Sequence, residues 1–155
     1  MELKDILTIS LAAIGSLIAL VSLIRALVEY QKQGATKRSE IFLDMRSRLR
    51  EDESFSRICD LLERDDPKLR EIPLVDRDRF IGFFEELALL RNSGLINDEV
   101  TLYMFGYFAI RCIDSRNFWY DLNRDQPLWA AFMDFARDMK SMHTVYEYDS
   151  SRFHL

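Results

Sequence analysis

The chain begins with a long apolar run that lacks the alternation of an amphipathic helix. Residues 6–24, ILTISLAAIGSLIALVSLI, form 19 uncharged positions bounded by Asp5 and Arg25. As a helix this run would extend roughly 28 Å, close to the hydrocarbon thickness of a bilayer. The pattern predicts a transmembrane helix over about residues 6–28, inside an N-terminal anchor formed by residues 1–33.

Two other interpretations of the run are weaker. A cleaved signal peptide normally starts with basic residues and ends at a small-x-small site, whereas this chain starts MELKD and continues after the run with RALVEY. A core helix of a soluble domain carries one apolar stripe, whereas this run is apolar on all sides. A membrane span is therefore the favoured interpretation.

Beyond residue 34 the apolar positions recur at helical spacing, and no strand pattern appears. Helices are expected over residues 35–50, 55–62, 76–93, 98–113 and 127–143, with a loop at 65–75 and a polar connector at 114–126. The predicted fold is all-α: one transmembrane helix, then a cytosolic bundle of four or five helices over residues 35–143. Residues 144–155 show no period and are expected to be a mobile tail.

Single residues mark several helix ends. Asp76 is predicted to be an N-cap, Gly94 a left-handed C-terminal residue, and Asn97 or Asp98 the next N-cap. Gly34 leaves open whether the chain bends there or continues as helix, at a cost of about 1 kcal/mol. Gly106 indicates either a close approach by a neighbour or a tolerated loss of helix propensity.

The predicted helix 98–113 has apolar residues on two faces. Leu102 and Phe105 belong to one face, whereas Tyr103, Tyr107 and Ile110 belong to the other. A helix that is apolar on both sides is typical of the middle of a bundle. We therefore expect neighbouring helices to cover both faces of this helix.

Composition and charge limit the function classes. The 155 residues carry a net charge of −5, which argues against general affinity for nucleic acid. The two cysteines, Cys59 and Cys112, are far apart and form no CxxC motif, which favours reduced, buried thiols over a disulfide framework or a zinc site.

Flanking charge sets the expected orientation. Only Lys4 precedes the span, whereas many basic residues follow it. By the positive-inside rule the N-terminus lies outside and the helical domain lies in the cytoplasm, at the cell inner membrane.

Small residues follow one face of the predicted span at alternating spacings of four and three. They are Thr8, Ala12, Gly15, Ala19, Ser22 and Ala26. Membrane helices associate through such faces because small side chains let backbones approach closely. This small-residue seam predicts homo-oligomerisation, with a chance pattern as the alternative; a polar pore is less favoured, because Thr and Ser supply little polarity.

The segment after the anchor is basic, and its cations are Lys37, Arg38, Arg46, Arg48 and Arg50. Anionic headgroups attract such residues by about 1 kcal/mol each, so lipid contact is the favoured role. A small anion, a nucleotide or RNA is a less favoured ligand. The acidic stretch that follows is an alternative partner for these charges.

Aromatic residues interrupt the polar connector at Phe118, Trp119 and Tyr120. Aromatic side chains often dominate protein interfaces, which makes this triplet a candidate contact for a partner protein. The alternative, a corner of the core, is favoured somewhat more.

No catalytic motif stands out. Glu85 and Glu86 are adjacent carboxylates, a pair that could serve acid–base chemistry. The pattern favours instead a solvated or salt-bridged helix face opposite the apolar one. Glu86 is expected to pair with a basic residue of the juxtamembrane helix. His143 and His154 are read as exposed, and Cys112 as a core thiol. We therefore expect no enzyme, no metal and no cofactor.

The order of these features resembles small bacterial single-pass membrane proteins with a helical cytosolic domain of unknown function. The segments that carry the resemblance are the span, the region from Tyr30 to Arg38 leading into IFLDMRSRLR, then FFEELALLRNSGLINDEVTLYMFGY, and PLWAAFMDFA. The resemblance implies a membrane anchor and helices; it implies no active-site residue.

Two functional hypotheses follow. The first is a membrane-anchored, oligomerising module whose helical domain binds a partner protein or a small signal, for which stress or phage-defence signalling is a fitting role. The alternative is a membrane-perturbing or pore-forming effector assembled through the small-residue seam.

Overall fold

A computed structural model describes the backbone of residues 3–145 and the side chains of residues 15, 16, 18–30 and 32–145. All regular elements in this described part are helices, and no strand occurs in it. The all-α prediction is therefore confirmed.

The chain divides into two compact units, Met1–Lys37 and Arg38–Leu155, which we describe separately. Helix α1 spans Leu3–Glu51, and Gly34 lies inside it in helical conformation. Over the described residues, none of the helices is long and apolar enough to cross a membrane. Of the predicted span, residues 6–14 and 17 lie outside the described side chains.

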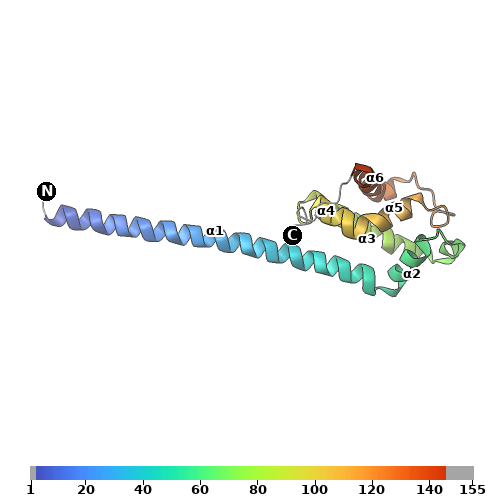
Figure 1. The fold of residues 1–155 in the computed structure, drawn as a ribbon, viewed down its shortest axis with the longest axis horizontal. Coiled ribbons are helices and arrows are strands. Elements are labelled where there is room, and N and C mark those ends of the chain that lie inside the picture. Colours follow the sequence, from blue (N-terminus) through green and yellow to red (C-terminus); the bar gives the residue numbers. More distant parts are fainter. Residues whose placement is uncertain (1–2, 146–155) are drawn as a thin grey trace. The chain divides into compact units, whose positions relative to one another are not determined.

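The second unit contains the end of α1 and the helices that follow it (Figure 1). These elements are α2 (Glu53–Leu62), the 3₁₀ turn η1 (Pro67–Glu71), α3 (Leu74–Asn92), α4 (Asp98–Thr101), the π-helical turn η2 (Leu102–Gly106), α5 (Tyr107–Asp114), the 3₁₀ turn η3 (Pro127–Trp129) and α6 (Ala130–Val145). Helix α6 contacts α3 and α5, and α2 contacts the same two helices. Since α4, η2 and α5 are continuous, this arrangement agrees with the predicted bundle of four or five helices.

Most helix ends follow the predicted cap chemistry. The Asn97 side chain accepts a hydrogen bond of 2.7 Å from the Val100 amide, and Gly94 has a φ of 71°. The Leu95 amide donates to the Leu90 carbonyl at 3.0 Å, which closes the end of α3. The Asp76 prediction is wrong: α3 starts at Leu74 after Pro73, and Asp76 lies in the first turn.

Two connecting segments hold more structure than the sequence indicated. The predicted loop 65–75 contains the η1 turn, which starts at Pro67 after the Asp66 side chain caps it. Of the predicted tail, Thr144 and Val145 belong to α6, and residues 146–155 lie outside the described residues.

Phenylalanines form the centre of the core. The fully buried Phe84 ring lies 5.2 Å from the rings of Phe80 and Phe83 and 5.9 Å from that of Phe132. Phe42 of α1 reaches Phe105 of η2 at 6.2 Å, so the end of α1 joins the same core. Tilted and edge-on rings of this kind add about 0.5–1.5 kcal/mol per pair beyond their burial.

Gly82 gives a first testable prediction, because it lies inside α3 with open space where a Cβ would stand. Gly82→Ala is expected to raise the free energy of unfolding by about 0.5–1 kcal/mol, since alanine loses less backbone entropy in a helix. Gly94→Ala, at positive φ, should instead lower it by roughly 1–2 kcal/mol. Denaturant titrations of the full chain in detergent measure both; equal effects of the two changes would contradict this account.

Candidate functional site

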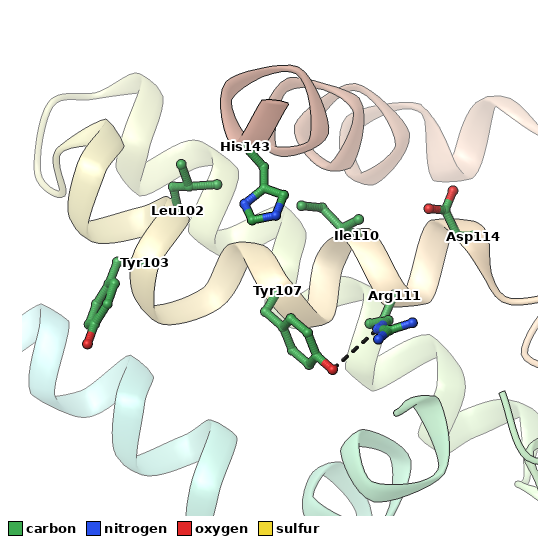
Figure 2. Close-up of a pocket in the computed structure, with 7 residues that line it drawn as sticks. All are labelled: Leu102, Tyr103, Tyr107, Ile110, Arg111, Asp114 and His143. Carbon is green, nitrogen blue, oxygen red and sulfur yellow. Dashed lines mark hydrogen bonds between the residues drawn. The ribbon is translucent and has the colours of Figure 1, made fainter. Parts of the chain in front are cut away.

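Residues of η2, α5 and α6 line a cavity of about 550 Å³ on the outside of the second unit (Figure 2). Its lining consists of Leu102, Tyr103, Tyr107, Ile110, Arg111, Asp114 and His143. All of these residues lie in the second unit.

The helical repeat explains why these side chains share one face. Tyr103, Tyr107 and Arg111 are four residues apart, so they form a row along η2 and α5. Ile110 belongs to the adjacent row, and His143 approaches from α6. The row begins in the π-helical turn, a type of segment often found at functional sites.

The structure corrects the expectation that this helix is covered on both sides. Its first face is buried, with Leu102 and Phe105 in the core. On the second face, Tyr103 is 57% exposed and Tyr107 is 46% exposed. The helix therefore presents aromatic side chains at the surface of the described chain, and these side chains form the cavity wall.

Gly106 has its tightest contact within its own helix. A Cβ at this position would lie 2.9 Å from Leu102 Cδ1 of η2 and 3.6 Å from Met139 Sδ of α6. The distance to α6 is that of an ordinary van der Waals contact, so a close approach by a neighbouring helix stays a prediction.

The two charged residues Asp114 and Arg111 of the cavity lining differ in their partners. Both carboxylate oxygens of Asp114 accept hydrogen bonds from Lys140 Nζ at 2.7 Å. The Arg111 guanidinium instead lies over the Tyr107 ring at 5.3 Å, and its Nε donates to the Tyr107 hydroxyl at 3.3 Å. Among the side chains that the structure describes, Arg111 forms an ion pair with no carboxylate.

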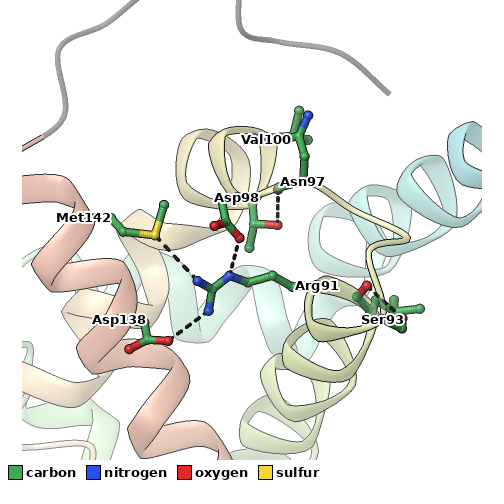
Figure 3. Close-up of polar contacts among 9 residues, drawn as sticks. Arg91, Ser93, Asn97, Asp98, Val100, Asp138 and Met142 are labelled. Carbon is green, nitrogen blue, oxygen red and sulfur yellow. Dashed lines mark hydrogen bonds and ion pairs between the residues drawn. The ribbon is translucent and has the colours of Figure 1, made fainter.

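Ion pairs hold the helices that carry the cavity. Arg91 at the end of α3 binds Asp98 at 2.6 Å and Asp138 of α6 at 3.0 Å, and it also reaches Met142 Sδ (Figure 3). Burial disfavours the charged Arg91, but its two carboxylate partners outweigh this and raise its pKa. The Asp114–Lys140 pair links α5 and α6 further along. Ion pairs therefore link the helices that carry the cavity.

The predicted lipid or anion residues have different surroundings. Arg48 donates to Glu86 at 2.6 Å and lies 5.6 Å from the Phe83 ring centre, which confirms the expected pair between Glu86 and the juxtamembrane helix. The hydrogen bond to Glu86 raises the Arg48 pKa. Arg46 and Arg50 line a second cavity of about 410 Å³ beside Cys59. Their role as lipid contacts, with Lys37 and Arg38, stays a prediction.

The small-residue seam is only partly within the described side chains. Thr8 and Ala12 lie outside them, whereas Gly15, Ala19, Ser22 and Ala26 are exposed. A Cβ on Gly15 would meet nothing within 4 Å. This face is therefore available to another helix, and oligomerisation through it stays a prediction.

The aromatic triplet is mostly core. Phe118 and Trp119 are buried, and the Trp119 indole donates to the Cys112 carbonyl at 2.8 Å. Only Tyr120 is exposed, with the Arg70 guanidinium 4.2 Å from its ring centre. The prediction of an exposed three-residue contact is wrong for the first two residues, because they fill the corner of the core beside Trp129.

Sequence reasoning missed the polar side chains that hold the connector. The Asp65 carboxylate, at a φ of 47°, accepts from the Ser115 hydroxyl and from the Asn117 amide. Burial works against its ionisation, but these hydrogen bonds outweigh burial and hold the Asp65 pKa below its usual value. The buried Arg77 binds Asp121 on the same connector at 2.7 Å. Neither contact has a sequence signal, because more than 40 residues separate the partners.

The remaining candidates are two glutamates, two cysteines and two histidines. Burial raises the Glu85 pKa, and Glu86 is held by Arg48. Cys59 and Cys112 are buried free thiols, as predicted, and burial raises the Cys59 pKa to about 12. His143 is exposed, and His154 lies outside the described residues. Among the described residues, no group of His, Cys, Asp and Glu side chains is placed to hold a metal ion.

Comparison with known proteins gives no family: the chain matches no family model, no curated protein and no solved structure. The resemblance to small bacterial single-pass membrane proteins therefore stays a prediction.

Proposed function

We propose that the protein is a membrane-anchored helical module that oligomerises through its N-terminal segment and binds a partner protein or a small signal with its helical domain. The domain lies on the cytoplasmic side of the inner membrane, because basic residues follow the anchor. One observation carries the proposal: α1 exposes a broad apolar surface between residues 18 and 28.

Six of these side chains illustrate the point. Ile18, Leu20, Leu23, Ile24, Leu27 and Val28 are between 46% and 60% exposed. Leu20, Leu23, Ile24, Leu27 and Val28 cover one broad side of the helix, because residues three and four apart share a face. Ser22, Arg25 and Glu29 lie toward another side. Lipid on one side and a second helix on the other would cover such a surface.

Membrane attachment has a direct test in the full chain. Ile18→Asp with Leu20→Asp should release the protein from membranes washed with alkaline carbonate, while the unaltered chain stays bound. Each Asp near a span centre costs about 2.5–3.5 kcal/mol. The control, Leu89→Asp with Leu128→Asp, adds the same charges at exposed positions of the second unit and should stay bound. Release of the unaltered chain would overturn the anchor.

Assembly has its own test. Gly15→Leu with Ala19→Leu should convert a detergent-solubilised oligomer into a monomer, as measured by light scattering, because bulky side chains block close helix approach. Open space around Gly15 within the chain means that a loss of assembly reports on contacts between chains. Leu20→Phe with Ile24→Phe adds bulk to the opposite side and should leave the mass unchanged. A monomeric unaltered chain would contradict oligomerisation.

The exposed seam residues also support the second candidate, a pore-forming effector. In that case the unaltered chain would release dye from vesicles, and Gly15→Leu with Ala19→Leu would abolish the leakage. Leakage that persists in this variant would remove the seam from the mechanism.

A further inference from the structure

We propose that the cavity between Tyr103, Tyr107, Arg111 and His143 binds a planar aromatic anion of mononucleotide size, a ring that carries a phosphate or carboxylate. This inference rests on the proposed function in one respect, because it names the class of small signal that the helical domain would recognise. Three observations lead to it: two exposed tyrosines, an arginine that pairs with no carboxylate among the described side chains, and the size of the cavity.

The tyrosines provide a surface for a flat ring. Tyr103 and Tyr107 lie one turn apart on the same helix face, and the two residues are 57% and 46% exposed. Leu102 and Ile110 complete the apolar part of the lining. Stacking of a base on an aromatic side chain contributes about 1–3 kcal/mol and tolerates any planar ring. The ligand therefore has an aromatic part.

Arg111 determines the sign of the ligand charge. Asp114, an acidic residue of the lining, has both carboxylate oxygens bound by Lys140 and forms no ion pair with Arg111. Arg111 Nε donates to the Tyr107 hydroxyl, and the planar fork of a guanidinium matches a phosphate or carboxylate. His143 adds ring nitrogens from α6. The ligand is therefore an anion.

The dimensions limit the ligand to a small molecule. A cavity of about 550 Å³ lies within the usual range of roughly 300–1,000 Å³ for small-molecule sites. One arginine is too few for a nucleic acid or a lipid surface, which bind through many phosphate contacts. Ion pairs of Arg91 with Asp98 and Asp138 link the helices that form this wall.

Calorimetric titration of the full chain in detergent tests the site with three probes: adenosine monophosphate, adenosine and inorganic phosphate. Adenosine has the ring without the charge, and phosphate has the charge without the ring. We expect adenosine monophosphate to bind at least about tenfold more tightly than either, because it alone engages both halves of the site. Equal binding of the three, or no binding at millimolar concentration, would overturn the inference.

Variants locate the site. Arg111→Gln should weaken adenosine monophosphate binding at least about tenfold and leave adenosine unchanged, since a charge-assisted hydrogen bond is lost. Tyr107→Leu should weaken adenosine, and should weaken adenosine monophosphate at least as much, because it also removes the contacts that position Arg111. Arg137→Gln removes a similar charge from an exposed position on α6 and should change neither. Equal losses in the two arginine variants would place binding elsewhere and overturn the assignment.

The same samples separate this inference from the proposed function. Light scattering and carbonate washing report assembly and membrane attachment, and neither depends on the cavity. A chain that is membrane-bound and oligomeric but binds no adenosine monophosphate would remove the ligand site alone. A chain that binds the probe but is released from membranes would remove the anchor and keep the site.

Discussion

Phe84→Ala is expected to lower the free energy of unfolding by about 3–5 kcal/mol, the largest effect that we predict for a single side chain. The Phe84 ring is fully buried and lies against Phe80 and Phe83 of its own helix and against Phe132 of α6. Its removal leaves a cavity between α3 and α6 that the surrounding rings cannot fill without leaving their favoured rotamers.

Chemical denaturation in detergent, followed by circular dichroism, measures this loss. Leu89→Ala is the matched control, because Leu89 lies on the same helix but is exposed, and its change should stay within about 0.5 kcal/mol. If both substitutions cost the same, the phenylalanine cluster would not be the centre of the core.

The effect of Phe84 could be anticipated from the sequence, because helical periodicity places it with Phe80 and Leu87 on one face. The same local rules predicted the Asn97 cap and the left-handed Gly94. Such features depend on residues within four or five positions of one another, where chain geometry alone decides the outcome. They account for the success of the helix assignment over most of the second unit.

Periodicity fails where the outcome depends on distant parts of the chain. It shows that η2 and α5 have two apolar faces, but not that only one of them receives a covering helix. It shows that Phe118 and Trp119 are aromatic, but not that the connector turns inward at that point. In both cases a tertiary contact decides whether an apolar residue becomes core or surface.

The candidate ligand site illustrates the same limit. Tyr103, Tyr107 and Arg111 share a row that the sequence reveals, whereas His143 joins them only because α6 packs against α5. The sequence also does not show that Lys140 binds Asp114, the acidic residue nearest to Arg111 along the lining helix. Helical spacing thus predicts which residues share a face, whereas the packing of the helices decides which charged residues are paired.

Asp121→Ala is expected to destabilise the fold by about 2–4 kcal/mol, because it leaves a buried charge without its partner. Arg77 is only 2% exposed, and its guanidinium binds the two Asp121 oxygens at 2.7 and 3.1 Å and the Phe118 carbonyl at 2.8 Å. Asp121 itself is half exposed, which places the expected cost toward the lower end. Asp125→Ala, at an exposed position of the same connector, is the control and should have little effect.

Protonation of Asp121 in acid should cause the same loss of stability as Asp121→Ala. The hydrogen bond from Arg77 lowers the Asp121 pKa in the folded protein, so its contribution is complete above the unfolded pKa of about 3.9. The contribution is lost as pH falls through the lowered, folded pKa. The stability difference between the unaltered chain and Asp121→Ala should therefore be constant near neutral pH and shrink below about pH 4. A difference that stays constant in acid would show that the charge pair is not its cause.

A second substitution separates the buried charge from lost packing. Arg77→Met removes the charge but keeps a long apolar side chain, so adding Asp121→Ala to it should cost much less than Asp121→Ala alone. Additive costs in this double-mutant cycle would contradict coupling between the two residues. Strong coupling would show that Arg77 sets the path of the connector, since its guanidinium holds both the backbone at Phe118 and the side chain at Asp121.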